Sequence, residues 1–344
     1  MCLCVISAPL SWPAVARAAE PASQVKSDEA ADRAKLFITL LKRRAERVLE
    51  AHRAPPPPVA TVSGGVSTGY ESNPNLDGAR KGDAFAEESF SVAFRPPITH
   101  WLKGEFVADF SNTNYLEFTD LNLRMTNLAG AFQIQPRPPL RLDLGVEYGI
   151  LNFPLDADSS FFDKRAKAHL SLAQTPWLTH KVGWTYQLRE YDTLKAHDSA
   201  QNRLEGLNRQ DQRHVALYEL QLRFPKTFAR AGVEWYRNFS NDQYQEFYDW
   251  EDILWRGILI RSLNPRLLAV LVGSQERKNY EARSVPAINV AERDDLWTAT
   301  GSLIYQLRPH TSLTCSTTYR YQDSNDPRLD FTDWIYQVGL EVEF

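Results

Sequence analysis

The chain has 344 residues, of which 43% are hydrophobic and 12% aromatic, and its formal net charge is −4. No apolar run approaches the 18 or more residues that a transmembrane helix needs; the clearest run covers only residues 267–272. These features exclude a helical membrane protein, and so weak a net charge gives no indication of a nucleic-acid partner.

Residues 1–18 have the features of a secretory leader. They are mostly apolar and end with Ala16 and Ala18, at the two positions where a cleavage site needs small residues. We predict that they form a signal peptide that is removed on export. Its removal would leave Cys315 as the single cysteine, so the mature chain would have no intramolecular disulfide.

Residues 19–58 are predicted to form a periplasmic helical segment followed by a Pro-rich linker. The helix, residues 27–52, begins with Ser27 as its capping residue, and four prolines at 55–58 end the segment. Its apolar residues form one stripe at helical spacing, which consists of Ala34, Phe37, Ile38, Leu41, Ala45, Val48 and Leu49. This stripe could bind a periplasmic partner, pair with a second copy or plug a channel, or the helix could act only as a tether.

From residue 59 to residue 344 the pattern changes to a period of two. Fourteen segments, each about 9 to 12 residues long, alternate apolar and polar side chains, as strands with one oily and one polar face do. The last segment, WIYQVGLEVEF at 334–344, places its large apolar residues on one parity and Glu341 and Glu343 on the other. The sequence therefore predicts fourteen strands.

The connections between these segments alternate in kind. Short turns that contain proline follow the even-numbered segments, whereas long polar loops, such as 192–212 and 276–295, follow odd-numbered ones. Hairpins with one short and one long end, and with strands of membrane-spanning length, are typical of outer-membrane barrels. A soluble sandwich gives no reason for this alternation, and the blades of a propeller have four short strands.

We therefore predict an all-β protein whose residues 59–344 form a transmembrane, antiparallel up-and-down β-barrel of about 14 strands, with a short helix before it. Such a barrel belongs in the bacterial outer membrane, where it would contact outer-membrane lipids and lipopolysaccharide.

If the apolar parity faces lipid, the polar parity lines the lumen. The charged residues that this phase predicts to be pore-lining are Arg95, Lys103, Glu105, Asp109, Arg141, Asp143, Glu147, Lys167, Lys181, Arg189, Glu219, Arg223, Arg230, Glu234, Arg308, Arg320, Glu341 and Glu343. They could form a selectivity surface or a salt-bridged, water-filled interior that carries nothing in particular. The segments at 253–262 and 267–275 are apolar on both parities and give no phase.

The end of the first predicted strand reads GYESNPN at 69–75. Its residues Gly69, Tyr70, Glu71, Ser72 and Asn73 resemble the Gly-Tyr-Asp-Ser-Asn signature of the barrels of surface lipoprotein assembly modifiers and of porin-like barrels from exopolysaccharide loci. The resemblance covers about residues 60–344 and implies an outer-membrane barrel. Those modifiers carry a large helical-repeat domain before the barrel, and one helix stands there in this chain, which favours a porin-like or polymer-export role.

The C-terminal residue, Phe344, is similar to the general signal by which the barrel-insertion machinery recognises outer-membrane barrels. We therefore expect this machinery to be a partner of the chain.

The sequence gives little sign of catalysis. His169 and Ser171 share one face of a predicted strand, but this face is the luminal one, and no Gly-x-Ser-x-Gly elbow is present. The stretch DADSSFF at 156–162 begins like a calcium loop, yet Phe161 stands where such a loop needs glycine. We predict that the protein is not an enzyme and has no cofactor or metal.

The function predicted from the sequence is a porin-like channel for small solutes or for an exported polysaccharide. The alternative is a barrel that does not conduct and that belongs to an assembly machinery, with its lumen closed by the 192–212 loop or by the helix.

Overall fold

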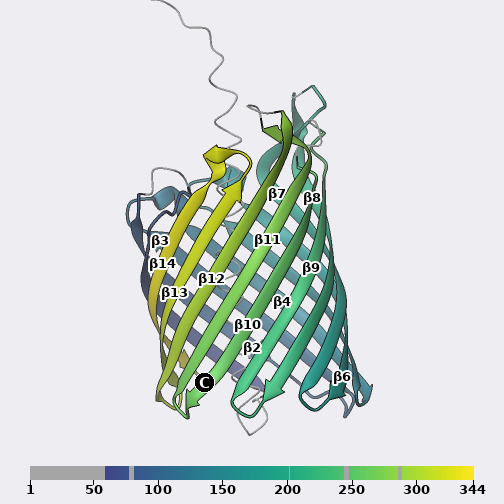
Figure 1. Ribbon diagram of the computed structural model, residues 1–344, viewed down its shortest axis with the longest axis vertical. Coiled ribbons are helices and arrows are strands. Elements are labelled where there is room, and N and C mark those ends of the chain that lie inside the picture. Colours follow the sequence, from purple (N-terminus) through teal and green to yellow (C-terminus); the bar gives the residue numbers. More distant parts are fainter. Residues whose placement is uncertain (1–58, 77–80, 201, 244–247, 286–288) are drawn as a thin grey trace, which may run out of the picture.

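The computed structural model describes residues 59–76, 81–200, 202–243, 248–285 and 289–344. In this part of the chain, fourteen antiparallel strands pair in sequence order, and the first pairs with the last to close a barrel (Figure 1). The predicted fourteen-stranded barrel is therefore confirmed. The predicted signal peptide, the helix at 27–52 and the Pro-rich linker lie outside the described residues.

The strands are β1 (Ala60–Glu71), β2 (Asp83–Phe94), β3 (Leu102–Tyr115), β4 (Leu123–Arg137), β5 (Leu140–Asn152), β6 (Phe161–Thr175), β7 (Leu178–His197), β8 (Arg203–Phe224), β9 (Thr227–Ser240), β10 (Trp250–Asn264), β11 (Leu267–Val285), β12 (Val290–Arg308), β13 (Thr311–Ser324) and β14 (Phe331–Glu343). Short 3-10 turns form η1 (Thr119–Leu121), η2 (Ala157–Ser159) and η3 (Pro327–Leu329). Among the described residues, no helix is long and apolar enough to cross a membrane.

Exposure alternates along the strands with the period of two that the sequence predicts. On β14, Trp334, Tyr336 and Val338 are exposed, whereas Asp333 and Ile335, which alternate with them, are buried. Because successive side chains of a strand point to opposite faces of the sheet, the exposed set covers the outside of the barrel and the buried set points inward.

The two ends of the barrel differ. Five connections at one end contain only two residues each, namely 138–139, 176–177, 225–226, 265–266 and 309–310. The C-terminus lies at the same end, at the bottom of Figure 1. Short turns mark the periplasmic end of an outer-membrane barrel, so the opposite end faces the outside of the cell.

The regions 192–212 and 276–295, which the sequence predicts as long polar loops, are mostly strand. β7 continues to His197 and β8 begins at Arg203, so their hairpin rises above the rim in Figure 1; β11 and β12 extend similarly. The register of the β7–β8 ladder shifts between Glu190 and Lys195. Above such a point both faces of a hairpin can meet water, so the strand no longer needs alternating side chains and its sequence resembles a loop.

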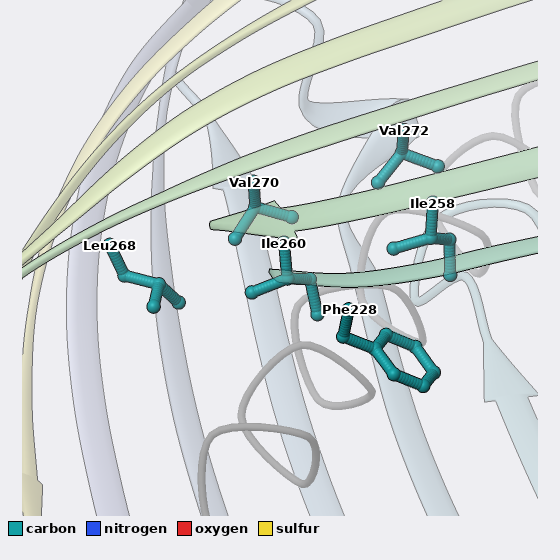
Figure 2. Close-up of a cluster of buried hydrophobic side chains, with 6 residues drawn as sticks. All are labelled: Phe228, Ile258, Ile260, Leu268, Val270 and Val272. Atoms are coloured by element: carbon teal, nitrogen blue, oxygen red, sulfur yellow. The ribbon is translucent and has the colours of Figure 1, made fainter. Parts of the chain in front are cut away.

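One part of the inner wall is apolar. Phe228 of β9, two isoleucines of β10 and three residues of β11 form a buried cluster near the short turns (Figure 2). Its members are Phe228, Ile258, Ile260, Leu268, Val270 and Val272. Leu259 and Leu271, which alternate with them, are exposed on the outer face. β10 and β11 are thus apolar on both faces, which explains why their sequence gives no phase.

Candidate functional site

The charged residues of the inner face form ion pairs between neighbouring strands. Arg95 Nε lies 3.2 Å from Glu105 Oε1, and Arg230 Nε lies 3.4 Å from Glu219 Oε2. Lys167 of β6 pairs with Glu147 of β5. Because basic and acidic side chains alternate around the wall, their charges are largely compensated locally.

The other residues predicted to line a pore have various surroundings. Arg141 pairs with Asp143 on its own strand, at 3.1 Å between Nε and Oδ2. Asp109 accepts a hydrogen bond from Ser91, and the guanidinium of Arg189 lies 3.8 Å from the centre of the Phe161 ring. Two more, Lys103 and Arg308, are exposed near the short turns. Three others are partly buried, namely Lys181, Glu341 and Glu343, while Arg223 is exposed and lies 6.0 Å from the centre of the Phe228 ring. That these residues line a pore stays a prediction.

A second group of charged residues was not predicted from the sequence. They lie on the inner face of the barrel, in the half that is farther from the short turns. Arg209 donates two hydrogen bonds to Asp211 and stacks 3.5 Å from the centre of the Tyr248 ring. On the β11–β12 hairpin, Arg283 Nε lies 3.1 Å from Glu292 Oε2. The sequence did not identify these four residues, because they lie in stretches that look like polar loops. The signal that could have found the first pair is the period-two run of Arg209, Asp211 and Arg213.

Arg256 of β10 was also missed, because the sequence of β10 gives no phase. It contacts Glu234 and lies 3.5 Å from Glu219, so three strands share one cluster of charges. Glu219 and Glu234, which the sequence predicts to line the lumen, therefore both lie close to an arginine that the sequence did not identify.

The GYESNPN motif lies at the seam where β1 meets β14. Glu71 is 2% exposed and accepts hydrogen bonds from Arg320 of β13 and from Tyr115 of β3. Arg320 also donates to Asp333 of β14, at 2.9 Å from Nε to Oδ2. The Asp333 carboxylate in turn accepts from the Ser72 hydroxyl at 3.0 Å. The motif therefore connects both ends of the barrel sheet through one buried charged network.

The first residue of the motif must be small. A Cβ on Gly69 would lie 2.5 Å from the Tyr336 carbonyl oxygen and 2.5 Å from a carbon of the Phe85 ring. Glycine therefore permits the close approach of β1 to β14. Tyr70 points outward, whereas the Asn73 N–H donates to Asp333 at 2.8 Å. In this structure each residue from Gly69 to Asn73 contributes to closing the barrel or to its outer surface.

Phe344 ends the chain beside the seam. It is 74% exposed, its ring stacks on His310 at 5.9 Å, and its backbone exchanges two hydrogen bonds with Val62 of β1. An exposed aromatic end is accessible to other proteins before insertion. Its role as an insertion signal stays a prediction.

His169 and Ser171, the pair considered for catalysis, lie on the inner face of β6, and Ser171 is 3% exposed. The described residues contain no group of three or more His, Cys, Asp or Glu side chains that could hold a metal ion. The described part of the structure provides no positive argument for an enzyme.

The outer surface defines the class of protein. Large apolar side chains are exposed around the barrel, among them Phe106, Val146, Trp184, Leu271 and Val338. Exposed aromatic residues lie toward the strand ends, as in the stacked pair Trp177 and Phe224. A closed sheet without free edges and with an apolar outer surface suits a lipid bilayer. The protein is an outer-membrane β-barrel, located in the bacterial outer membrane.

No protein-family model and no curated protein sequence matches the chain. Solved structures to which it is similar include OmpT, an outer membrane protein of Vibrio cholerae, at 7% identity over 83% of this chain and 98% of that chain, with a TM-score of 0.48. They also include an anion-selective porin from Comamonas acidovorans, at 10% identity over 83% and 99%, with a TM-score of 0.46. A third is OprB of Pseudomonas putida, at 8% identity over 83% and 94%, with a TM-score of 0.45.

Proposed function

We propose that the protein is a porin-like channel of the outer membrane that passes small solutes or an exported polysaccharide. The observation that carries this proposal is the closed ring of fourteen strands with charged side chains of both signs on its inner face. Strands about 4.8 Å apart and tilted by about 40° give a backbone diameter of about 28 Å. Side chains would leave an opening on the order of 10 Å, which suits small solutes or an extended polymer.

Single-channel recording of the refolded protein in a planar bilayer tests this proposal. Stable ohmic openings would support a channel, with a conductance that grows with salt concentration. Silence from protein whose heat-modifiable mobility shows a folded barrel would contradict it. Neutral and acidic oligosaccharides added to one side would then separate the two cargo classes, because a cargo that enters the lumen interrupts the current.

A barrel that does not conduct, with a role in assembly or as a scaffold for exopolysaccharide or lipoprotein machinery, is the second candidate. One observation favours it: Arg320, Asp333 and Asp211 of the inner face are each 0% exposed. Charged side chains that line a wide water-filled path would be more accessible. This candidate predicts that the folded protein remains silent in the bilayer and is purified together with a periplasmic or surface partner.

A further inference from the structure

The outer face of β10 to β13 has a hollow about midway along these strands, which lie side by side on the near face of the barrel in Figure 1. Gly257 of β10 pairs with Gly273 of β11, and Gly273 pairs with Ala299 of β12. The hollow has a volume of about 730 Å³, and Leu271 and Trp334 are among its larger lining side chains. This volume lies within the range of ligand pockets, about 300–1,000 Å³.

The backbone would tolerate a side chain at both glycines. A Cβ on Gly257 would lie 3.8 Å from the Arg230 carbonyl oxygen, and one on Gly273 would lie 4.0 Å from the Thr298 carbonyl oxygen. Both are ordinary van der Waals distances, so larger side chains would fit and would fill the hollow. Glycine inside a strand weakens the strand and often marks a position that a ligand approaches closely. The hollow therefore offers room to an apolar group from the surrounding bilayer.

Two arginines lie on the same outer face, toward the external ends of β11 and β12. Arg277 Nε lies 2.8 Å from Asp295 Oδ1, and Arg293 Nε lies 3.4 Å from Asp295 Oδ2. The Asp295 side chain is 10% exposed, whereas those of the two arginines are 51% and 55% exposed. One carboxylate thus holds two guanidiniums side by side through Nε, which leaves their terminal nitrogens available to an anion. A second carboxylate, that of the exposed Asp323 of β13, lies opposite Asp295.

This arginine pair lies at the external border of the membrane. Arg277 follows Leu267, the first residue of β11 after the short turn, by ten residues. At about 3.4 Å per residue and a tilt of about 40°, the rise is about 26 Å, which matches the apolar band of about 25 Å of an outer-membrane barrel. Between the hollow and the pair, Trp255 and Trp297 flank Gln275 and are 57% and 47% exposed, as in an interfacial girdle.

The geometry points to a binding site for one lipopolysaccharide molecule, with an acyl chain in the hollow and a lipid A phosphate on Arg277 and Arg293. The site faces the outer leaflet, which in this membrane consists of lipopolysaccharide, and the guanidiniums complement its phosphates in charge and geometry. Gly273 and Arg277 are four residues apart on β11, or about 13 Å, so a single lipid reaches both features. Binding at this site does not require the barrel to conduct.

Titration of the refolded full chain with lipid A, followed by native mass spectrometry in detergent, tests the phosphate contact. Arg277→Gln combined with Arg293→Gln should weaken the binding of bisphosphorylated lipid A at least about tenfold, because charge-assisted hydrogen bonds are lost. The same double variant should bind dephosphorylated lipid A as the unchanged chain does. Arg261→Gln is the matched control, since Arg261 is exposed on the outer face of β10 toward the short turns and should affect neither ligand. Asp323→Asn should not weaken binding, because a carboxylate repels the phosphate.

The same titration tests the hollow. Gly273→Leu should weaken the binding of both forms of lipid A at least about tenfold, whereas Ala168→Leu, at an exposed outer position of β6, should not. Heat-modifiable mobility shows that each variant is folded. Three outcomes would overturn the proposed site: equal affinity of all variants, tighter binding of phosphatidylglycerol than of lipid A, or a dimer that Gly273→Leu abolishes while lipid A still binds.

Discussion

Arg320 holds the charged network of the seam. It is 0% exposed and contacts two carboxylates, those of Glu71 and Asp333, on strands that are first and last in the sequence. When one member of a buried ion pair is removed, its partners keep their desolvation cost without compensation. The stability of the closed barrel should therefore be sensitive to this single side chain.

We expect Arg320→Met to lower the free energy of unfolding by about 3–5 kcal/mol, because two buried carboxylates then lose their cation. Guanidinium unfolding in lipid vesicles measures this change. Arg308→Met is the matched control, since Arg308 is an exposed residue of the neighbouring strand and its loss should cost less than about 0.5 kcal/mol. If the two substitutions lower the free energy of unfolding equally, the charged network of the seam does not stabilise the barrel more than an exposed residue does.

The external loop between β13 and β14 contains a pH-sensitive contact. Hydrogen bonds from Arg328 to Asp326 hold the pKa of the Asp326 carboxyl below its ordinary value. A lowered carboxyl pKa means that the contact stabilises the loop above the pKa of the unfolded chain, and that this contribution disappears as the pH falls through the folded pKa. NMR titration should give a midpoint below that of a free 322–332 peptide. Arg328→Met should bring the two midpoints closer together, and the backbone N–H of residue 328 still donates to Asp326.

At the residue scale, alternation predicts which side chains share a strand face but not which of them meet. Glu71 and Arg320 are 249 residues apart in the chain, and their contact depends on the closure of the sheet. Arg256 could not be placed because β10 is apolar on both faces. To predict which charges pair, one must know the register between neighbouring strands. The pattern within a single strand does not contain this information.

Among the elements, the β7–β8 hairpin is the longest, with strands of 20 and 22 residues. Its tip is held from the side by Asp242, which accepts a hydrogen bond from the His197 backbone at 3.1 Å. Since the ladder shifts register between Glu190 and Lys195, the tip is separated from the part that completes the barrel wall.

Deletion of residues 195–207 with a two-residue Asn-Gly replacement should therefore change the unfolding free energy by less than about 1 kcal/mol. It should also leave the conductance unchanged, which urea unfolding and bilayer recording can check. The matched control deletes 187–213, and so removes rungs of the wall; it should not fold. A marked rise in conductance in the first variant would instead mean that the hairpin closes the lumen.

The strands themselves were predictable, because lipid on one side and a polar lumen on the other impose alternation. The extended hairpins were not. Above the membrane no such constraint exists, and a polar strand pair looks like a loop in its sequence. The apolar cluster of β9, β10 and β11 was also hidden, since apolar residues on the outer face cancel the alternation.

For the whole molecule, the interleaved charges of the inner face predict weak ion selectivity. In the chain that lacks residues 27–52, the reversal potential in a tenfold salt gradient should lie close to zero. The double variant Arg141→Glu, Lys167→Glu should shift it toward the value for cations, because four negative charges replace two ion pairs. Lys81→Glu, in an external loop, is the control and should leave the potential unchanged.

The seam has a kinetic consequence. Thirteen of the fourteen strand pairings join neighbours in the sequence, whereas the pairing of Ser63 with Glu343 joins residues 280 positions apart. A growing sheet can therefore add hairpins one after another, but its first edge must stay unpaired until the last strand arrives. Closure is then the late, slow step of folding, and the intermediate before it has two open edges that can aggregate. Substitutions in the seam should slow this step far more than equally destabilising substitutions in the middle of the sheet.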